Sequence, residues 1–438
     1  MEEDARTLSL VILNQFESSQ NQLGKIQNDF FSKKKYLIKT KARAKILTNE
    51  IIRLKGRIDY LIEQISGKKN RNFNKNLLSI LRIGFYEILY DHNIPDYAAV
   101  SSAVDLTKSK LNRKASGLTN AVLRKLIRKK ESSQEWEENY KKDPRWNSFP
   151  LWIQSRWLKQ SSSEKYLKLI TAFNKAPKTF VRNDSGKTNT QLKEILDLDE
   201  IESEIFNPFF LKIKKGTRKI LNHDLFQSGK ISIQDPSSYG IVQCLGLKKN
   251  DIVLDVCAAP GTKSLAMSFL VGESGKVFSS DSDTSRVELG VKDLKRNKLN
   301  NIFWLTKDAT KDRYPLVDNI LIDAPCSGTG VMRRKADIKW RRKELDIDFF
   351  SKLQFKIISH MSQFLKPGGI LVYGTCSIEY LENWYVVEQF LKLNNNFSLI
   401  SLPTNINTTW IDKRGCLDTI TDIHEVDGMF AARIKKND

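Results

Sequence analysis

The feature that most constrains the fold is a repeated alternation in the C-terminal half of the chain. From about residue 231 onward, short apolar runs are each followed by a polar turn and then by apolar residues at helical spacing. This alternation predicts a parallel sheet with helices on both faces. Ligands bind such sheets outside the carboxyl ends of the strands, so the residues after each run are the functional candidates. The runs are DIVLDV, KVFSS, IFWLT, NILIDA and ILVYGT.

The N-terminal part of the chain has a different pattern. Up to about residue 140, apolar residues recur at three- and four-residue spacing with almost no strand signal, which predicts helices. One of them runs from Leu77 to Leu89 and must end before Pro95. Residues 151–230 mix short helix and strand signals and suggest a small α/β module. The predicted domains are therefore all-α over 1–142, small α/β over 143–230 and a larger α/β domain over 231–438.

The positive charge is unevenly distributed. The net charge is +21, and residues 1–150 carry 29 Lys and Arg against 17 Asp and Glu, whereas residues 231–438 carry 28 against 25. A polyanionic partner on the N-terminal half is the functional interpretation of this surplus. A lysine-rich sequence with well-solvated faces is the alternative.

Several classes of protein are disfavoured. The N-terminus has no secretory pattern, and no apolar stretch approaches transmembrane length. The five cysteines are odd in number and form no CxxC pair, and the four histidines are scattered. These features argue against disulfides and a metal site, and they favour a reducing compartment. We expect a cytoplasmic monomer with neither a membrane nor a metal as partner.

Acidic residues stand at the ends of three successive predicted strands, at Asp255, Asp281 and Asp308. Asp255 opens a loop of small residues that leads into a helix, but neither GxGxxG nor a Walker A pattern is present. An acid after the second strand of a nucleotide-binding sheet can accept both ribose hydroxyls. Together the acids suggest an adenosine ligand that lacks phosphates, although each alone could be a turn or cap residue.

Two cysteines occupy the next two strand ends. The fourth strand ends in Asp323-Ala-Pro-Cys326 and the fifth in Gly-Thr-Cys376-Ser. Parallel strands would bring these thiols close together, and neighbouring thiols suggest covalent catalysis on an electron-poor carbon. From the residues alone, two structural cysteines are an equal alternative.

The motifs DVCAAPGTK, LIDAPCSGTG, RRKADIKWRR, LKPGGILVYGTCSIEYLEN and DGMFAARI follow one another through the C-terminal half. In this order they resemble the NOL1/NOP2/Sun family of RNA cytosine-5 methyltransferases. The segment RNFNKNLLSILRIGFYEILYDHNIPDYAAVSSAVDLTK resembles the NusB-type helical domain of the Sun/Fmu (RsmB) branch, whose bacterial members methylate a cytosine of 16S rRNA. The resemblance implies a helical RNA-binding domain, a small linker domain and a Rossmann-like domain that binds S-adenosylmethionine.

The resemblance also implies roles for individual residues. Cys376 would be the nucleophile, Cys326 would help to release the RNA product, and Asp323 would lie beside both the methyl donor and the target base. Asp281 would bind the ribose hydroxyls and Asp308 the adenine. The loop that would hold the methionine part of the donor comprises Cys257, Ala258, Ala259, Pro260, Gly261, Thr262 and Lys263.

This chain departs from the family pattern at one position of that loop. Thr262 replaces the usual second glycine, and a threonine would be strained if the position required a positive φ. We expect Thr262 to lie in the first turn of the following helix, where it fits easily.

A run of basic residues follows the Asp323 loop and could hold RNA phosphates near the target base, with a solvated helical face as the alternative. Its members are Arg333, Arg334, Lys335, Lys339, Arg341 and Arg342. The predicted activity is methyl transfer to carbon 5 of a 16S rRNA cytosine. A cytosine-5 methyltransferase acting on tRNA or on another rRNA site and, from another class, a non-catalytic RNA-binding factor stay open.

Overall fold

The computed structural model describes residues 4–438, so the first three residues of the predicted 1–142 domain lie outside the described residues. Contacts divide the chain into two compact units. The first unit extends to Ala176 and also contains Met332–Arg342, and the second contains Pro177–Val331 and Lys343–Asp438. The predicted boundary after residue 142 falls within the first unit and that after residue 230 within the second. The three-domain division therefore stays a prediction.

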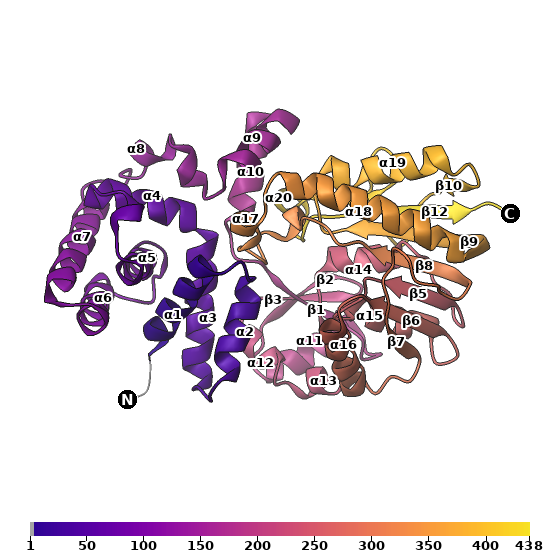
Figure 1. Ribbon diagram of the computed structural model, residues 1–438. Coiled ribbons are helices and arrows are strands. Elements are labelled where there is room, and N and C mark those ends of the chain that lie inside the picture. The colour runs from indigo at the N-terminus through magenta and orange to yellow at the C-terminus, as the bar shows by residue number, and fades with distance from the viewer. Residues whose placement is uncertain (1–3) are drawn as a thin grey trace. The chain divides into compact units, whose positions relative to one another are not determined.

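The first unit is all helical, as its apolar spacing predicts (Figure 1). The helix predicted from Leu77 to Leu89 is α5, which ends at Tyr90, before Pro95. α5 contributes Ile80, Leu81 and Phe85 to the core that the surrounding helices close around it. The helices are α1 (Ala5–Ser18), α2 (Leu23–Ser32), α3 (Ile38–Arg53), α4 (Lys55–Ser66), α5 (Lys75–Tyr90), α6 (Asp96–Lys110), α7 (Arg113–Glu131), α8 (Glu138–Lys141), α9 (Leu151–Gln160), α10 (Ser163–Phe173) and, from the later segment, α17 (Ile338–Arg341).

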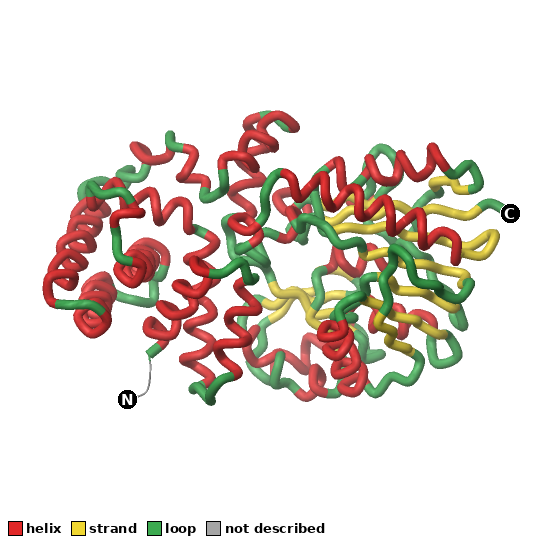
Figure 2. The backbone as a smooth tube through the Cα atoms, viewed as in Figure 1, coloured by secondary structure: helices red, strands yellow, loops and turns green. Residues whose placement is uncertain are grey.

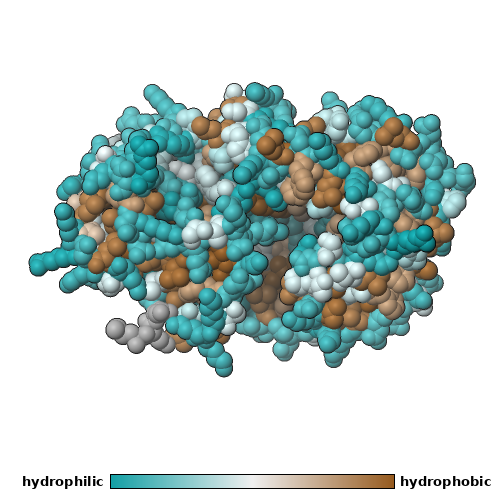
Figure 3. Space-filling model, in the orientation of Figure 1, coloured by the Kyte–Doolittle hydropathy of each residue, from teal (hydrophilic) through white to brown (hydrophobic). Residues whose placement is uncertain are grey.

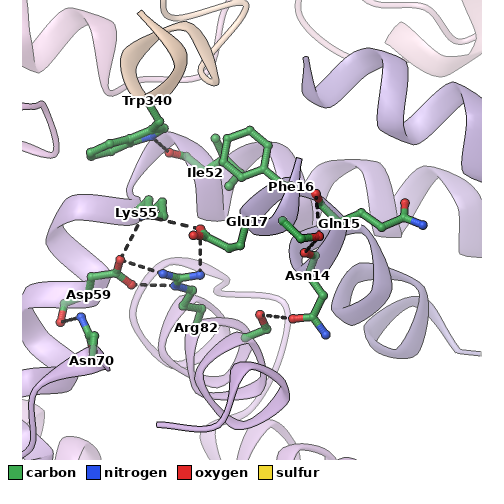
Figure 4. A network of polar contacts seen from close by, with 12 residues as sticks. Asn14, Gln15, Phe16, Glu17, Ile52, Lys55, Asp59, Asn70, Arg82 and Trp340 are labelled. Atoms are coloured by element: carbon green, nitrogen blue, oxygen red, sulfur yellow. Dashed lines mark hydrogen bonds and ion pairs between the residues drawn. The ribbon is translucent and has the colours of Figure 1, made fainter. Parts of the chain in front are cut away.

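An ion-pair network around the buried Arg82 ties three helices of this unit together (Figure 4). The Arg82 guanidinium donates to both oxygens of Asp59, at 2.6 and 2.9 Å, and to Glu17 at 3.1 Å. Burial alone would raise the pKa of Asp59, but Arg82 and Lys55 lower it below its usual value. The network therefore links α1, α4 and α5 through charges that compensate one another.

The second unit begins with a four-stranded antiparallel sheet in the order β2-β3-β1-β4. Apolar residues of α11, among them Leu192 and Leu196, pack with Val181 and Leu211 of the strands and form the core of this module. The elements are β1 (Thr179–Asn183), α11 (Asn189–Leu198), β2 (Ser203–Asn207), β3 (Phe210–Ile213), α12 (Thr217–Ile220), α13 (Asp224–Gln227) and β4 (Ile231–Ile233).

The main sheet of the second unit has the strand order β10-β12-β9-β8-β5-β6-β7, with β11 paired to β12 (Figures 1 and 2). The five predicted strands are β5 to β9, and they are parallel. The antiparallel neighbour β12 contains MFAARI from the motif DGMFAARI, whose strand character the alternation did not reveal. The elements are α14 (Pro236–Gln243), β5 (Ile252–Val256), α15 (Thr262–Val271), β6 (Lys276–Asp281), α16 (Thr284–Asn297), β7 (Ile302–Thr306), β8 (Val317–Asp323), α18 (Leu345–Met361), β9 (Leu365–Thr375), α19 (Trp384–Leu393), β10 (Phe397–Leu399), β11 (Leu417–Thr419), α20 (Thr421–His424) and β12 (Met429–Lys436).

The strand order explains how helices cover both faces of this sheet. The chain moves outward in one direction from β5 to β6 and β7, and in the opposite direction from β8 to β9. Right-handed crossovers then place α15 and α16 on one face and α18 on the other. The carboxyl ends of β5 to β9 all lie along one edge of the sheet, where the predicted site residues follow.

Candidate active site

The loop after β5 turns sharply into α15. Cys257 has a φ of +62° and Gly261 a φ of +104°, and α15 begins at Thr262. A Cβ at position 261 would lie 2.7 Å from Cζ2 of Trp304, so a side chain there would be both strained and crowded. Gly261, and not Thr262, therefore occupies the position that needs glycine. The structure confirms the expectation that Thr262 lies in the first helical turn.

The carboxylate at the end of β6 is tied to this loop. Asp281 accepts hydrogen bonds from the backbone N–H of Ala259 at 3.2 Å and of Asp283 at 3.1 Å, and it forms an ion pair of 3.1 Å with Arg286. Its side chain is almost fully buried. The predicted ribose acid and the predicted methionine loop thus form one hydrogen-bonded assembly.

Asp308, the predicted adenine contact, is bound to its own turn. It accepts hydrogen bonds from the backbone N–H and the hydroxyl of Thr310, at 2.9 and 2.7 Å. These bonds and the nearby Lys311 ammonium lower the pKa of Asp308 below its usual value. The carboxylate is about one-third exposed, and its role toward adenine stays a prediction.

Asp255, at the carboxyl end of β5, supplies a further polar group. It is fully buried, and its Oδ2 accepts a hydrogen bond of 2.5 Å from Ser264, whereas its Oδ1 has no hydrogen-bond partner among the described residues. Burial raises the pKa of Asp255 to about 7. A buried acceptor without a partner is costly, so this oxygen fits a ligand that brings a donor, such as the ammonium group of an amino acid.

The tips of β8 and β9 bring the two cysteines together. Cys326 Sγ and Cys376 Sγ lie 3.2 Å apart. Their proximity follows from the sheet, because Asp323 pairs with Gly374 in the parallel register and the N–H of Ala324 donates to the Gly374 carbonyl at 2.9 Å. The sequence prediction that the thiols are neighbours in space is therefore confirmed.

Lys263, at the start of α15, lies beside the thiol pair. Its Nζ forms an ion pair of 2.7 Å with Asp323 Oδ2. Burial alone would lower the pKa of Lys263, but the charges of Asp323, Cys376 and Asp255 raise it above its usual value. The tips of β5, β8 and β9 are thus linked through one largely buried ammonium group.

Glu382, for which the sequence suggested no role, joins the loops that carry the two cysteines. Its Oε1 accepts hydrogen bonds from the backbone N–H of Ser327 at 2.7 Å and from Gln354 Nε2 at 3.2 Å, and its Oε2 accepts one from the Ser377 hydroxyl at 2.6 Å. The Ser327 hydroxyl also donates to Oε2. One buried carboxylate therefore holds the residue after each cysteine. The available signal was the second of two glutamates in the stretch CSIEYLEN, which begins at Cys376.

Comparisons with known proteins agree with this geometry. Residues 242–435 match the family model described as 16S rRNA methyltransferase RsmB/F, and residues 3–128 match the NusB family. A probable ribosomal RNA small subunit methyltransferase B of Bacillus subtilis is 31% identical over 394 residues, which cover 86% of this chain and 87% of the relative. The chain belongs to the RsmB/F family of 16S rRNA methyltransferases. This membership confirms the predicted family, the methyltransferase class with its donor S-adenosylmethionine, and the NusB-type helical domain.

One further relative and one solved structure are also similar to this RsmB/F chain. The ribosomal RNA small subunit methyltransferase B of Photorhabdus laumondii is 29% identical and covers 97% of the chain and 96% of its own length. The crystal structure of PH0851 covers 100% of both chains with a TM-score of 0.77 at 23% identity, which supports the fold. Over residues 4–438, no helix is long and apolar enough to cross a membrane, and no group of three or more potential ligand residues forms a metal site.

The two thiols of this RsmB/F chain have different electrostatic surroundings. The hydrogen bond with Cys376, burial, and the charges of Cys376 and Glu382 all raise the pKa of Cys326 above its usual value. Cys376, by contrast, lies within electrostatic reach of the Lys263 ammonium, whose pKa is raised by Asp323 and, after it, by Cys376. The two thiols therefore differ in the charged group beside them.

Part of the basic run that follows the Asp323 loop is buried, whereas its predicted role requires exposed side chains. Residues 332–342 pack within the helical unit. Lys339 is fully buried, and its Nζ donates to the Arg53 carbonyl at 3.2 Å and to Asn174 Oδ1 at 2.6 Å. Arg333 is also buried, and Arg341 donates to the Phe16 carbonyl at 2.5 Å. Burial of Lys339 and Arg333 contradicts their prediction as phosphate contacts, because phosphates cannot reach buried side chains. Arg334 is exposed, and its contact with RNA stays a prediction.

Proposed function

We propose that this methyltransferase transfers a methyl group from S-adenosylmethionine to carbon 5 of a cytosine in 16S rRNA, through a covalent bond between Cys376 and C6 of the base. The observation that carries the proposal is the pair of thiols 3.2 Å apart beside the Lys263–Asp323 ion pair. Carbon 5 of cytosine is a weak nucleophile until a nucleophile adds at C6. A thiolate with an adjacent acid is suited to that addition.

The first half of the reaction activates the base. The Cys376 thiolate adds to C6, the C5–C6 π bond breaks, and Asp323 in its acid form gives its proton to N3. The Asp323 carboxylate that results is stabilised by the Lys263 ammonium at 2.7 Å. S-adenosylmethionine supplies an electrophilic methyl group for C5 when it is bound. The residues that hold it are those of the loop from Cys257 to Lys263, together with Asp281 and the unpaired Asp255 Oδ1.

The second half releases the product. A water molecule takes the C5 proton, the electron pair of the C5–H bond re-forms the C5–C6 double bond, and the C6–S bond breaks so that Cys376 leaves as a thiolate. The N3 proton returns to Asp323. Cys326 assists this release, because its neutral thiol lies within hydrogen-bond distance of the departing Cys376 sulfur. The target base must leave its stack for C6 to be attacked.

Variants of the two cysteines test the assignment. Cys376→Ala should abolish both turnover and the covalent complex with 16S rRNA that contains 5-fluorocytosine. Cys326→Ala should form the covalent complex with ordinary 16S rRNA and release it slowly, so that the adduct accumulates. Turnover by Cys376→Ala would refute the covalent role, and an absence of adduct with Cys326→Ala would refute the role in release.

A separate assay tests the substrate. Protein-free 16S rRNA, assembled small subunits and tRNA are incubated side by side with enzyme and labelled methyl donor, and 5-methylcytosine is located by bisulfite sequencing. We expect modification of 16S rRNA at one cytosine. Methylation of tRNA alone, or of a base other than cytosine, would contradict the proposal.

A further inference from the structure

The turn between α2 and α3 concentrates positive charge in the helical unit. Between residues 33 and 49 the sequence contains seven cationic residues and no acidic one. Arg43 is engaged inside the unit by ion pairs with Glu87 and Asp91. The remaining six define what we call the α2–α3 lysine surface: Lys33, Lys34, Lys35, Lys39, Lys41 and Lys45.

The lysine surface is accessible and largely without counter-charges. Lys33, Lys34, Lys35 and Lys39 are exposed, and Lys41 and Lys45 are half-buried. Over residues 4–438, no carboxylate forms an ion pair with Lys33, Lys35, Lys39, Lys41 or Lys45. In the space-filling view, hydrophilic side chains project from the end of the α2–α3 hairpin (Figure 3). Like charges held this close repel one another, so an anionic partner would lower the energy of the surface.

An aromatic cluster fixes the shape of the turn. The rings of Phe30 and Tyr36 stack with centroids 5.7 Å apart, and Phe31 meets Phe30 edge to face at 5.4 Å. Three of the lysines lie over these rings, Lys34 at 5.0 Å from Tyr36 and both Lys41 and Lys45 within 6 Å of Phe31. These contacts order the lysine stems and present the ammonium groups together.

The ammonium groups of Lys41 and Lys45 lie close enough to interact electrostatically. Burial, and after it the charge of Lys41, lower the pKa of Lys45 below its usual value. A phosphate bound between the two ammonium groups would offset the repulsion between Lys41 and Lys45. The surface therefore has both the charge and the order that phosphate recognition requires.

We propose that the α2–α3 lysine surface binds the phosphate backbone of rRNA and so docks the substrate on the helical unit. The inference rests on the proposed function for the identity of the RNA. Phosphate contacts fix register and affinity but do not read bases, so selection of the target cytosine belongs to the catalytic unit. An anionic membrane would offer similar charge, but an enzyme of an rRNA methyltransferase family has an RNA polyanion as its substrate.

The test compares two full-length variants with the same charge change. The first is Lys33→Gln, Lys34→Gln, Lys35→Gln and Lys39→Gln combined. The matched control combines Lys248→Gln, Lys292→Gln, Lys295→Gln and Lys413→Gln, which are exposed lysines of the second unit. Binding of protein-free 16S rRNA is measured between about 50 and 300 mM salt, together with kcat and KM for methylation.

We expect the first variant to bind rRNA about tenfold more weakly near 0.15 M salt, with a slope of log K against log salt that is less steep by about three. KM should rise with the dissociation constant, while kcat at saturating RNA stays within about twofold. The control should change binding by less than about threefold. Replacing the same four lysines with arginine should retain the salt slope, which separates loss of charge from misfolding.

Equal salt slopes for the wild type, the first variant and the control would overturn the inference while leaving the proposed chemistry intact. Binding to phosphatidylserine vesicles is measured in parallel, and loss of vesicle binding with unchanged rRNA binding would also overturn it. If wild-type protein makes no 5-methylcytosine, the proposed function fails, and the salt slopes still report on the surface independently.

Discussion

Two basic segments of the helical unit look alike in sequence and differ in their structural surroundings. Residues 333–342, RRKADIKWRR, lie against α1, α3 and the end of α10, where Lys339 and Arg341 donate to backbone carbonyls and to the Asn174 amide oxygen. Residues 33–45, KKKYLIKTKARAK, form the turn after α2 and the first part of α3, and five of their lysines form no ion pair with a carboxylate within residues 4–438. The first segment uses Lys339 and Arg341 for packing, whereas the second leaves Lys33, Lys34, Lys35 and Lys39 exposed.

A high density of charge in a sequence does not by itself identify a binding surface. Trp340 anchors the first segment through an indole N–H that donates to the Ile52 carbonyl at 2.8 Å (Figure 4). Asp337 accepts the backbone N–H of Leu23 at 3.0 Å, at the start of α2. Apolar and acidic residues interspersed among the cations thus dock that segment. The lysine run at 33–35 has no such residue within it.

The largest expected effect comes from removing the anchor. Trp340→Ala should lower the free energy of unfolding of the helical unit by about 2 to 4 kcal/mol, because the indole packs against Gly56, lies under the Lys55 ammonium and donates a buried hydrogen bond. Urea denaturation of the full chain measures the change. Tyr97→Ala, at a side chain that is 78% exposed, is the control and should change stability by less than about 0.5 kcal/mol. Similar effects of the two variants would show that the segment is not docked.

The next effect concerns the buried charge of Lys339. Burial, followed by repulsion from Arg53 and Arg57, holds the pKa of Lys339 well below its usual value. The unfolded chain therefore binds this proton more readily than the folded chain, so the contribution of Lys339 to stability rises as the pH increases from the folded pKa toward about 10.4.

Lys339→Met should consequently stabilise the protein more at pH 7 than at pH 10, with a difference of about 1 to 2 kcal/mol. Urea denaturation at the two pH values measures this difference. The affinity for 16S rRNA should stay within about twofold of the wild type at both. A loss of RNA binding in Lys339→Met, with unchanged stability, would restore the sequence-based interpretation of Lys339 as a phosphate contact.

The smallest expected effect separates the exposed members of the two segments. Arg334→Gln combined with Lys335→Gln should weaken rRNA binding by less than about twofold, whereas Lys33→Gln combined with Lys35→Gln should weaken it by about three- to fivefold near 0.15 M salt. The two variants carry the same charge change, so filter binding at matched salt compares them directly. A larger effect from the Arg334 pair would reverse the comparison.

Much of the second unit, which contains the candidate active site, could be predicted from the sequence. Local sequence patterns, together with the regular geometry of a parallel sheet, predicted three features. These are the five parallel strands, the thiols at neighbouring strand tips and the helical position of Thr262. The strand β12 and the Glu382 contacts could not be found in this way. Both depend on pairing with distant residues, the first with β9 and the second with Ser327 and Gln354.

The sequence by itself determined the family, the two kinds of architecture and the residues proposed to carry the chemistry, because periodicity and motif order are properties of the chain. The tertiary structure alone decided which cysteine lies near the Lys263 ammonium and which lysines face solvent. Both depend on distances between groups and on burial, and the neighbours of a residue in the sequence fix neither. Cys376 beside Lys263 and the exposed lysines at the end of the α2–α3 hairpin are the two results of that placement.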